Sequence, residues 1–150
     1  MRSTKRTGRP ETAVRLFRRG WNCSQAVLSA FAPRLGLDAR RARLLAQAFG
    51  AGLARRGETC GAVTGALMAI GLKYGKTRAD DSPARDKTYD LARTLMERFR
   101  SRHGALSCRA LLGHDIATAR GRKKIEAAGL HDTLCPRLVR SAASLLDRLL

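Results

Sequence analysis

Residues 59–74 are apolar on almost every side when they are wound into a helix. Their sequence is TCGAVTGALMAIGLKY. A helix without a polar face has to be buried on all sides, and this segment falls short of the ~20 apolar residues that a membrane-spanning helix needs. Gly61 and Gly65 lie four residues apart, on one face, where a second backbone can come close. We therefore expect this segment to be the buried central helix of the domain.

The rest of the chain also shows apolar residues at helical spacing, together with capping residues and helix-ending glycines. The further helices that we expect are 11–19, 22–33, 39–50, 84–103, 107–112, 116–128 and 136–150. Their buried sides are expected to include Leu44, Leu45, Phe49 and Tyr89. No run of residues alternates convincingly between apolar and polar, so no sheet is expected. The sequence predicts an all-α fold, a single-domain helical bundle of about seven to eight helices.

The length of 150 residues fits one domain with a real core. We expect residues 1–10 to be a mobile basic N-terminal tail and residues 11–150 to be a four-cysteine helical domain. The tail is not followed by the apolar stretch that a secretory signal requires. These features predict a cytoplasmic protein without membrane insertion.

The formal net charge is +18, from 30 basic and 12 acidic residues. Such a charge suits a nucleic-acid partner, because neutralised phosphates release counterions. However, the arginines are spread along the chain and are not interleaved with aromatic residues that stack on bases. We therefore prefer a solvated basic surface, and a basic nucleic-acid-binding module with incidental cysteines is kept as an alternative. No phosphate-binding glycine motif or serine-nucleophile motif is present, so nothing indicates a hydrolase or a kinase, and an enzymatic role stays open.

Four cysteines carry the clearest chemical signal, and each falls at an expected helix start. They are Cys23, Cys60, Cys108 and Cys135. The first three follow residues that cap helices, and the fourth precedes a proline, which is favoured in the first helical turn. In a reducing compartment, metal binding or redox chemistry is a better interpretation of such cysteines than structural disulfides. The partial positive charge of a helix N-terminus lowers the pKa of a thiol there.

Two kinds of site follow from this placement. Four thiolates at four helix N-termini suit a tetrathiolate zinc site or a cysteine-ligated iron–sulfur cluster. A thiol–disulfide redox protein without metal is the alternative. The cysteines are separated by 37, 48 and 27 positions, without a C-x-x-C pair, so only the tertiary fold can gather them. If it does not, they are small packing residues.

Several segments resemble one known family. They are N-C-S-Q-A-V-L (22–28), G-E-T-C-G-A-V-T-G-A-L-M (57–68), H-G-A-L-S-C-R-A-L-L-G-H-D (103–115) and the late Cys135. The chain resembles the C_GCAxxG_C_C family of small redox-active proteins, which is named for four cysteines, one of them within C-G-A-x-x-G. The resemblance covers nearly the whole chain. Ala51 departs from it, since relatives tend to have glycine there.

The resemblance implies a helical protein of about this size, in which all four cysteines bind an iron–sulfur cluster or another metal. The function that the resemblance implies is electron transfer, or the sensing of redox state or metal. The implied partner is a redox protein or a membrane transporter. His103 and His131 precede Cys108 and Cys135 by five and four residues. Either histidine could join a metal shell or hydrogen-bond a sulfur, although such histidines more often finish a helix or face solvent.

Overall fold

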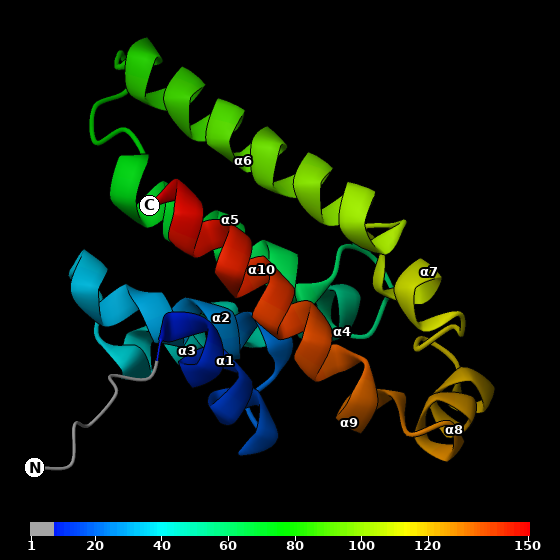
Figure 1. The fold of residues 1–150 in the computed structure, drawn as a ribbon. Coiled ribbons are helices and arrows are strands. Elements are labelled where there is room, and N and C mark those ends of the chain that lie inside the picture. Colours follow the sequence, from blue (N-terminus) through cyan, green and yellow to red (C-terminus); the bar gives the residue numbers. More distant parts are fainter. Residues whose placement is uncertain (1–7) are drawn as a thin grey trace, which may run out of the picture.

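The computed structural model describes residues 8–150, and these residues form helices without a strand (Figure 1). The elements are α1 (Arg9–Arg18), α2 (Cys23–Phe31), η1 (Ala32–Leu35), α3 (Ala39–Ala46), η2 (Gln47–Phe49), α4 (Gly50–Leu53), α5 (Gly61–Tyr74), α6 (Ser82–His103), α7 (Cys108–Leu112), α8 (Ala119–Ala127), α9 (Leu130–Thr133) and α10 (Cys135–Leu149). Elements α4 and α9 have four residues each, and the backbone of α4 is left-handed from Ala51 onward. The all-α class predicted from the sequence is confirmed.

Side-chain caps fix where several helices begin. Asn22 forms a capping box at the start of α2, in which its Oδ1 accepts from the Gln25 N–H at 2.9 Å and its own N–H donates to Gln25 Oε1 at 3.1 Å. Asp38 caps α3 and Ser107 caps α7, as the sequence predicts. Each cap satisfies an N–H group that has no partner within its helix.

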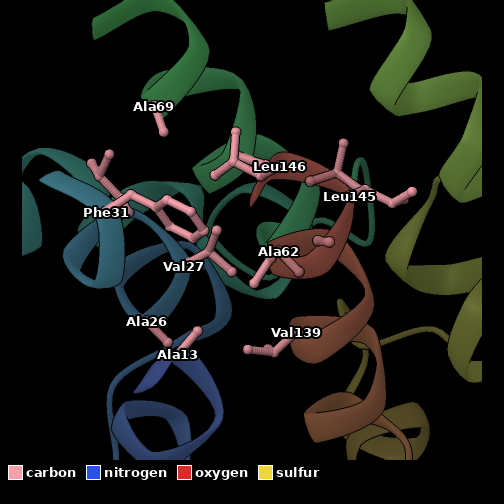
Figure 2. Packing of buried hydrophobic residues seen from close by; sticks show 14 of the residues in the cluster. Ala13, Ala26, Val27, Phe31, Ala62, Ala69, Val139, Leu145 and Leu146 are labelled. Atoms are coloured by element: carbon pink, nitrogen blue, oxygen red, sulfur yellow. The ribbon is translucent and has the colours of Figure 1, made fainter. Parts of the chain in front are cut away.

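The core surrounds α5, as the apolar character of 59–74 predicts. Helix α5 packs against α2, α6 and α10, and α1 covers both α2 and α10. Figure 2 shows Val27 and Phe31 of α2 meeting Leu146 of α10 and Ala62 of α5. Many of the buried side chains are alanine or valine, which lets these helices lie close together.

One long helix and three short ones complete the fold. Helix α6 lies along the outer side of α5 and α10, and only Leu95 and Phe99 of α6 are buried (Figure 1). Helices α7, α8 and α9 gather near the first turn of α10. There Cys108, Leu112 and Ile125 form a small second core. This end of the bundle holds the candidate site.

Four side chains that the sequence places on buried faces are exposed instead. Leu44 is 63% exposed, Leu45 61%, Phe49 40% and Tyr89 56%. Helix α3 ends at Ala46 and turns Ala42 and Ala46 inward, so the larger residues point outward. Helix α6 touches the core mainly through its C-terminal half, which leaves Tyr89 outside.

Helix α1 occupies the first part of the chain that the structure describes. Of the expected tail, residues 1–7 lie outside the described residues, and α1 begins at Arg9, two residues before the expected helix. Within residues 8–150, no helix combines the length and apolar character needed to cross a membrane.

Candidate thiol site

All four cysteines line one small cavity at the α7–α9 end of the bundle. The cavity has a volume of about 20 Å³, and its wall also includes Ala51, Gly52, Gly61, Leu111, Leu112 and Leu138. The four cysteines are free thiols. The fold therefore brings together four residues that are far apart in the sequence.

Each cysteine stands at the beginning of a helix. Cys23, Cys108 and Cys135 are the first residues of α2, α7 and α10, and Cys60 is the N-cap of α5. The unpaired N–H groups of a first helical turn favour negative charge nearby. The arrangement thus directs four helix N-termini at one cavity.

A short backbone pairing holds Cys60 beside Cys108. Thr59 and Ser107 form an isolated antiparallel bridge. The Cys60 N–H donates to the Leu106 carbonyl at 2.8 Å, and the Cys108 N–H donates to the Glu58 carbonyl at 2.6 Å. These bonds join the segment before α5 to the segment before α7, a pairing that the sequence analysis missed because no alternating pattern marks it.

A close helix crossing positions Cys23. A Cβ atom added to Gly61 would lie 3.0 Å from Cys23 Cβ and 3.1 Å from the Ser24 nitrogen. A side chain at this position would push α2 away from α5, so glycine is needed for the two cysteine-bearing helix starts to approach. The predicted close crossing at Gly61 and Gly65 is confirmed.

A left-handed turn forms another part of the wall. Residues 51–55 all have φ between 53° and 67°, although only Gly52 among them is glycine. A Cβ atom at Gly52 would lie 2.7 Å from Cys108 Cβ, so this turn packs directly against a cysteine. Left-handed backbone costs a non-glycine residue roughly 1–2 kcal/mol, and such strain concentrates at functional sites. The sequence signal for the turn is weak, since four of its five left-handed residues are not glycine.

Burial keeps two of the thiols protonated. It raises the pKa of Cys60 to about 11, even though the N–H groups of Ala62 and Val63 donate to its sulfur. Burial also raises the pKa of Cys108 to about 12, and the charges of Cys60 and Cys135 add to the effect. The expectation that helix N-termini lower the pKa of every thiol is therefore wrong for this pair, because desolvation outweighs the helix ends.

The ionisation of Cys135 is linked to that of Cys23 through a contact between their side chains. This contact lowers the pKa of Cys135 below its usual value, against the opposing effects of burial and of the Asp132 carboxylate. The same contact, with burial and the charges of the other three cysteines, raises the pKa of Cys23 well above its usual value. The two thiols therefore do not ionise independently.

The two histidines considered as site residues lie outside the cavity wall. His103 Nε2 is 2.7 Å from Ser141 Oγ, and its ring lies against Phe99 with the centroids 4.6 Å apart. The ring of His131 lies against Phe17, with 4.7 Å between centroids. These contacts give both histidines packing partners away from the sulfurs.

The four thiols are suitable metal ligands by residue type, but they are not spaced as metal ligands are. Four thiols suit zinc or an iron–sulfur cluster. Among residues 8–150, however, no three His, Cys, Asp or Glu side chains are grouped as metal ligands are. A cavity of about 20 Å³ has room for little more than one water-sized particle. The residue types fit a thiolate-bound metal, and the present spacing does not.

Comparison with known proteins supports the resemblance drawn from the cysteine segments. No curated protein and no solved structure matches the chain. A family model matches residues 21–149, and its description reads "Putative redox-active protein (C_GCAxxG_C_C)". The match spans most of the chain and includes all four cysteines. The chain therefore belongs to the C_GCAxxG_C_C family.

Proposed function

We propose that this protein is a thiol–disulfide redox protein in which Cys23 and Cys135 are the exchanging pair. The observation that carries the proposal is that the two free thiols line one cavity, where a contact between their side chains shifts their pKa values in opposite directions. In thiol–disulfide exchange, a thiol with a lowered pKa attacks as the thiolate, and a second thiol beside it resolves the mixed disulfide. Cys135 and Cys23 fit these two roles.

The chemistry needs an oxidised partner, which is a disulfide. The Cys135 thiolate attacks one sulfur of that disulfide and forms a mixed disulfide with it, while the partner's S–S bond breaks and the leaving thiolate takes up a proton to become the first released thiol. Cys23 then loses its proton and attacks Cys135 Sγ, which forms the Cys23–Cys135 disulfide and releases the second thiol. Two electrons and two protons pass from the protein to the partner. The largest cause of the raised pKa of Cys23 is its contact with Cys135, which ends once Cys135 is in the mixed disulfide. Burial, which persists, is the largest cause of the raised pKa values of Cys60 and Cys108, so these two thiols stay protonated at neutral pH.

A second candidate is a metal centre held by Cys23, Cys60, Cys108 and Cys135, either an iron–sulfur cluster or another thiolate-bound metal. Support comes from the four helix starts that meet at one cavity, because their N–H groups would offset the charge of several thiolates. When bound, such a group would supply one-electron transfer or metal sensing. The sulfurs would first have to be regrouped around it.

Single Cys→Ser variants at all four positions separate the two candidates. After anaerobic purification, each variant is assayed for bound metal and for the disulfide that forms on mild oxidation, mapped by mass spectrometry. We expect the disulfide to be lost in Cys23→Ser and Cys135→Ser and kept in Cys60→Ser and Cys108→Ser. Stoichiometric metal in the unmodified protein, lost equally in all four variants, would overturn the thiol–disulfide proposal in favour of the metal centre.

A further inference from the structure

The C-terminal half of α5 borders an apolar groove. The groove has a volume of about 450 Å³ and is lined by Leu37, Leu45, Phe49, Met68, Gly71 and Leu72, together with the buried Leu28. Within the described residues, the groove and the cysteine cavity share no lining residue. Leu72 comes twelve residues after Cys60, which is about 18 Å along a helix. The groove and the thiols therefore lie at opposite ends of α5.

Three of the side chains that line the groove are large, apolar and exposed, namely Leu45, Phe49 and Leu72. Single exposed apolar residues are normal on a protein surface, but several that meet at one hollow mark a place where another molecule binds. Gly71 leaves space in the groove, because a Cβ atom there would meet nothing within 4 Å. The groove is thus both apolar and open to an incoming side chain.

The exposure of these side chains also indicates what kind of molecule fits the groove. A small ligand buries about 70–90% of its surface in its site, and a groove whose lining residues face solvent does not enclose a ligand in this way. An amphipathic helix buries only one face, through apolar residues at positions i, i+3, i+4 and i+7. The shape of the groove therefore favours a helix over a small molecule.

The charge of the surrounding elements indicates the other face of that helix. Residues 21–50 and 61–76, which include every residue that lines the groove, contain six arginines and lysines and one carboxylate, that of Asp38. The Asp38 carboxylate already accepts from the Arg41 N–H and lies 3.6 Å from Arg41 Nε. An acidic partner is attracted to such a surface, whereas a second copy of this chain, with its own net charge of +18, is repelled.

We propose that this groove docks an acidic amphipathic helix of a partner protein. The apolar face of that helix fills the groove, and its aspartate or glutamate side chains face the surrounding arginines and lysines. Residues 1–7 of this chain, MRSTKRT, do not have this chemistry, because they are basic and contain a single apolar side chain. The inference does not depend on the thiol chemistry, since the partner docks away from the cysteine cavity.

Three synthetic peptides, each stapled into a helix, test the proposal on the reduced full-length protein by fluorescence anisotropy. The first has leucines along one face and glutamates elsewhere. The second has lysines in place of the glutamates, and the third has the composition of the first in an order without an apolar face. We expect the first peptide to bind at least about tenfold more tightly than the other two, and to bind less tightly as salt screens the charges.

Two neighbouring leucines provide a variant and its matched control. Leu45→Ser should weaken binding of the first peptide by about tenfold, because an apolar contact in the groove is lost. Leu44→Ser should leave binding unchanged, because Leu44 has nearly the same exposure, 63% against 61%, but does not line the groove. Gly71→Leu should also prevent binding by filling the groove. Equal affinity of the Leu45→Ser and Leu44→Ser variants for the first peptide would overturn the inference.

A second copy of the chain is the other occupant that the experiment distinguishes. Sedimentation velocity over a range of protein concentrations is measured for the unmodified protein and for Leu45→Ser. We expect both to be monomeric. If the unmodified protein dimerises and Leu45→Ser does not, the groove is an interface between copies of this chain, and the acidic partner helix is ruled out.

Discussion

Gly65 of α5 lies directly against the backbone of Ser24 in α2. A Cβ atom at Gly65 would stand 2.7 Å from the Ser24 carbonyl oxygen and 3.1 Å from its Cα. Ser24 follows Cys23, and Cys60 caps the helix to which Gly65 belongs. This contact therefore helps to set the separation of two of the four cysteines.

The Gly65→Ala variant should be destabilised by about 1–3 kcal/mol, because the added methyl group meets backbone atoms that cannot rotate away. Gly71→Ala in the same helix is the matched control, since a Cβ atom there meets nothing within 4 Å. The control should gain up to ~1 kcal/mol from better helix propensity. Urea unfolding at neutral pH measures both, and equal stability of the two variants would show that the crossing is not tight.

In the left-handed turn at 51–55, we expect a substitution to glycine to stabilise the protein. Ala54 has φ 53° and ψ 43° and its side chain is exposed. Glycine adopts this backbone freely but also gains freedom in the unfolded chain, so we expect Ala54→Gly to stabilise the protein by about 0.5–1 kcal/mol. Thermal unfolding under reducing conditions is the measurement.

Ala127→Gly provides the comparison for that substitution. Ala127 is exposed and lies in α8, where glycine should cost about 0.5–1 kcal/mol. The two substitutions remove the same atom from exposed alanines in backbones of opposite hand. A loss of stability in both would contradict the left-handed turn.

The predictable parts of this structure are those set by local sequence. Asn22 and Ser107 cap helices because their side chains reach N–H groups three residues away, and such spacing can be read directly. The apolar sequence around Gly61 and Gly65 required a buried helix whichever neighbour covered it. The helix starts at the four cysteines follow from the same local signals.

The unpredicted parts depend on contacts between distant segments. Leu44 and Leu45 lie outward because α3 ends early and packs through alanine, which periodicity alone does not reveal. The meeting of all four cysteines at one cavity comes from how the starts of α2, α5, α7 and α10 pack together. The elevated pKa values of Cys60 and Cys108 come from burial, which depends on the assembled core.

Alkaline pH should weaken the fold through Cys60. Its pKa is about 11 in the folded protein against an ordinary value of 9.0, so the unfolded chain loses this proton first as the pH rises. The contribution is fully present below about pH 9 and is lost between there and pH 11, amounting to about 2 kcal/mol by pH 10.5. Urea unfolding of the reduced protein at pH 8 and pH 10.5 should show a larger loss for the unmodified protein than for Cys60→Ala. Equal losses would contradict a buried, protonated Cys60.

The order in which the thiols react with iodoacetamide should follow their pKa values. Cys135 should be labelled first, with a half-maximal rate below the ordinary thiol pKa of 9.0, because the contact with Cys23 lowers its pKa. Cys60 and Cys108 should resist labelling until the protein unfolds. Peptide mass spectrometry after short exposures between pH 6 and pH 10 gives the profile for each cysteine.

Two substitutions move the Cys135 profile in opposite directions. Cys23→Ala removes the thiol whose contact lowers the Cys135 pKa, so the midpoint of labelling should move to higher pH. Asp132→Asn removes a carboxylate that raises the same pKa, so the midpoint should move to lower pH. A general loosening of the site would expose Cys135 and speed its labelling at every pH, without opposite shifts of the midpoint. If both variants moved the midpoint the same way, the ionisation of Cys135 would not be governed by Cys23, and the exchanging pair would have to be sought among the other thiols.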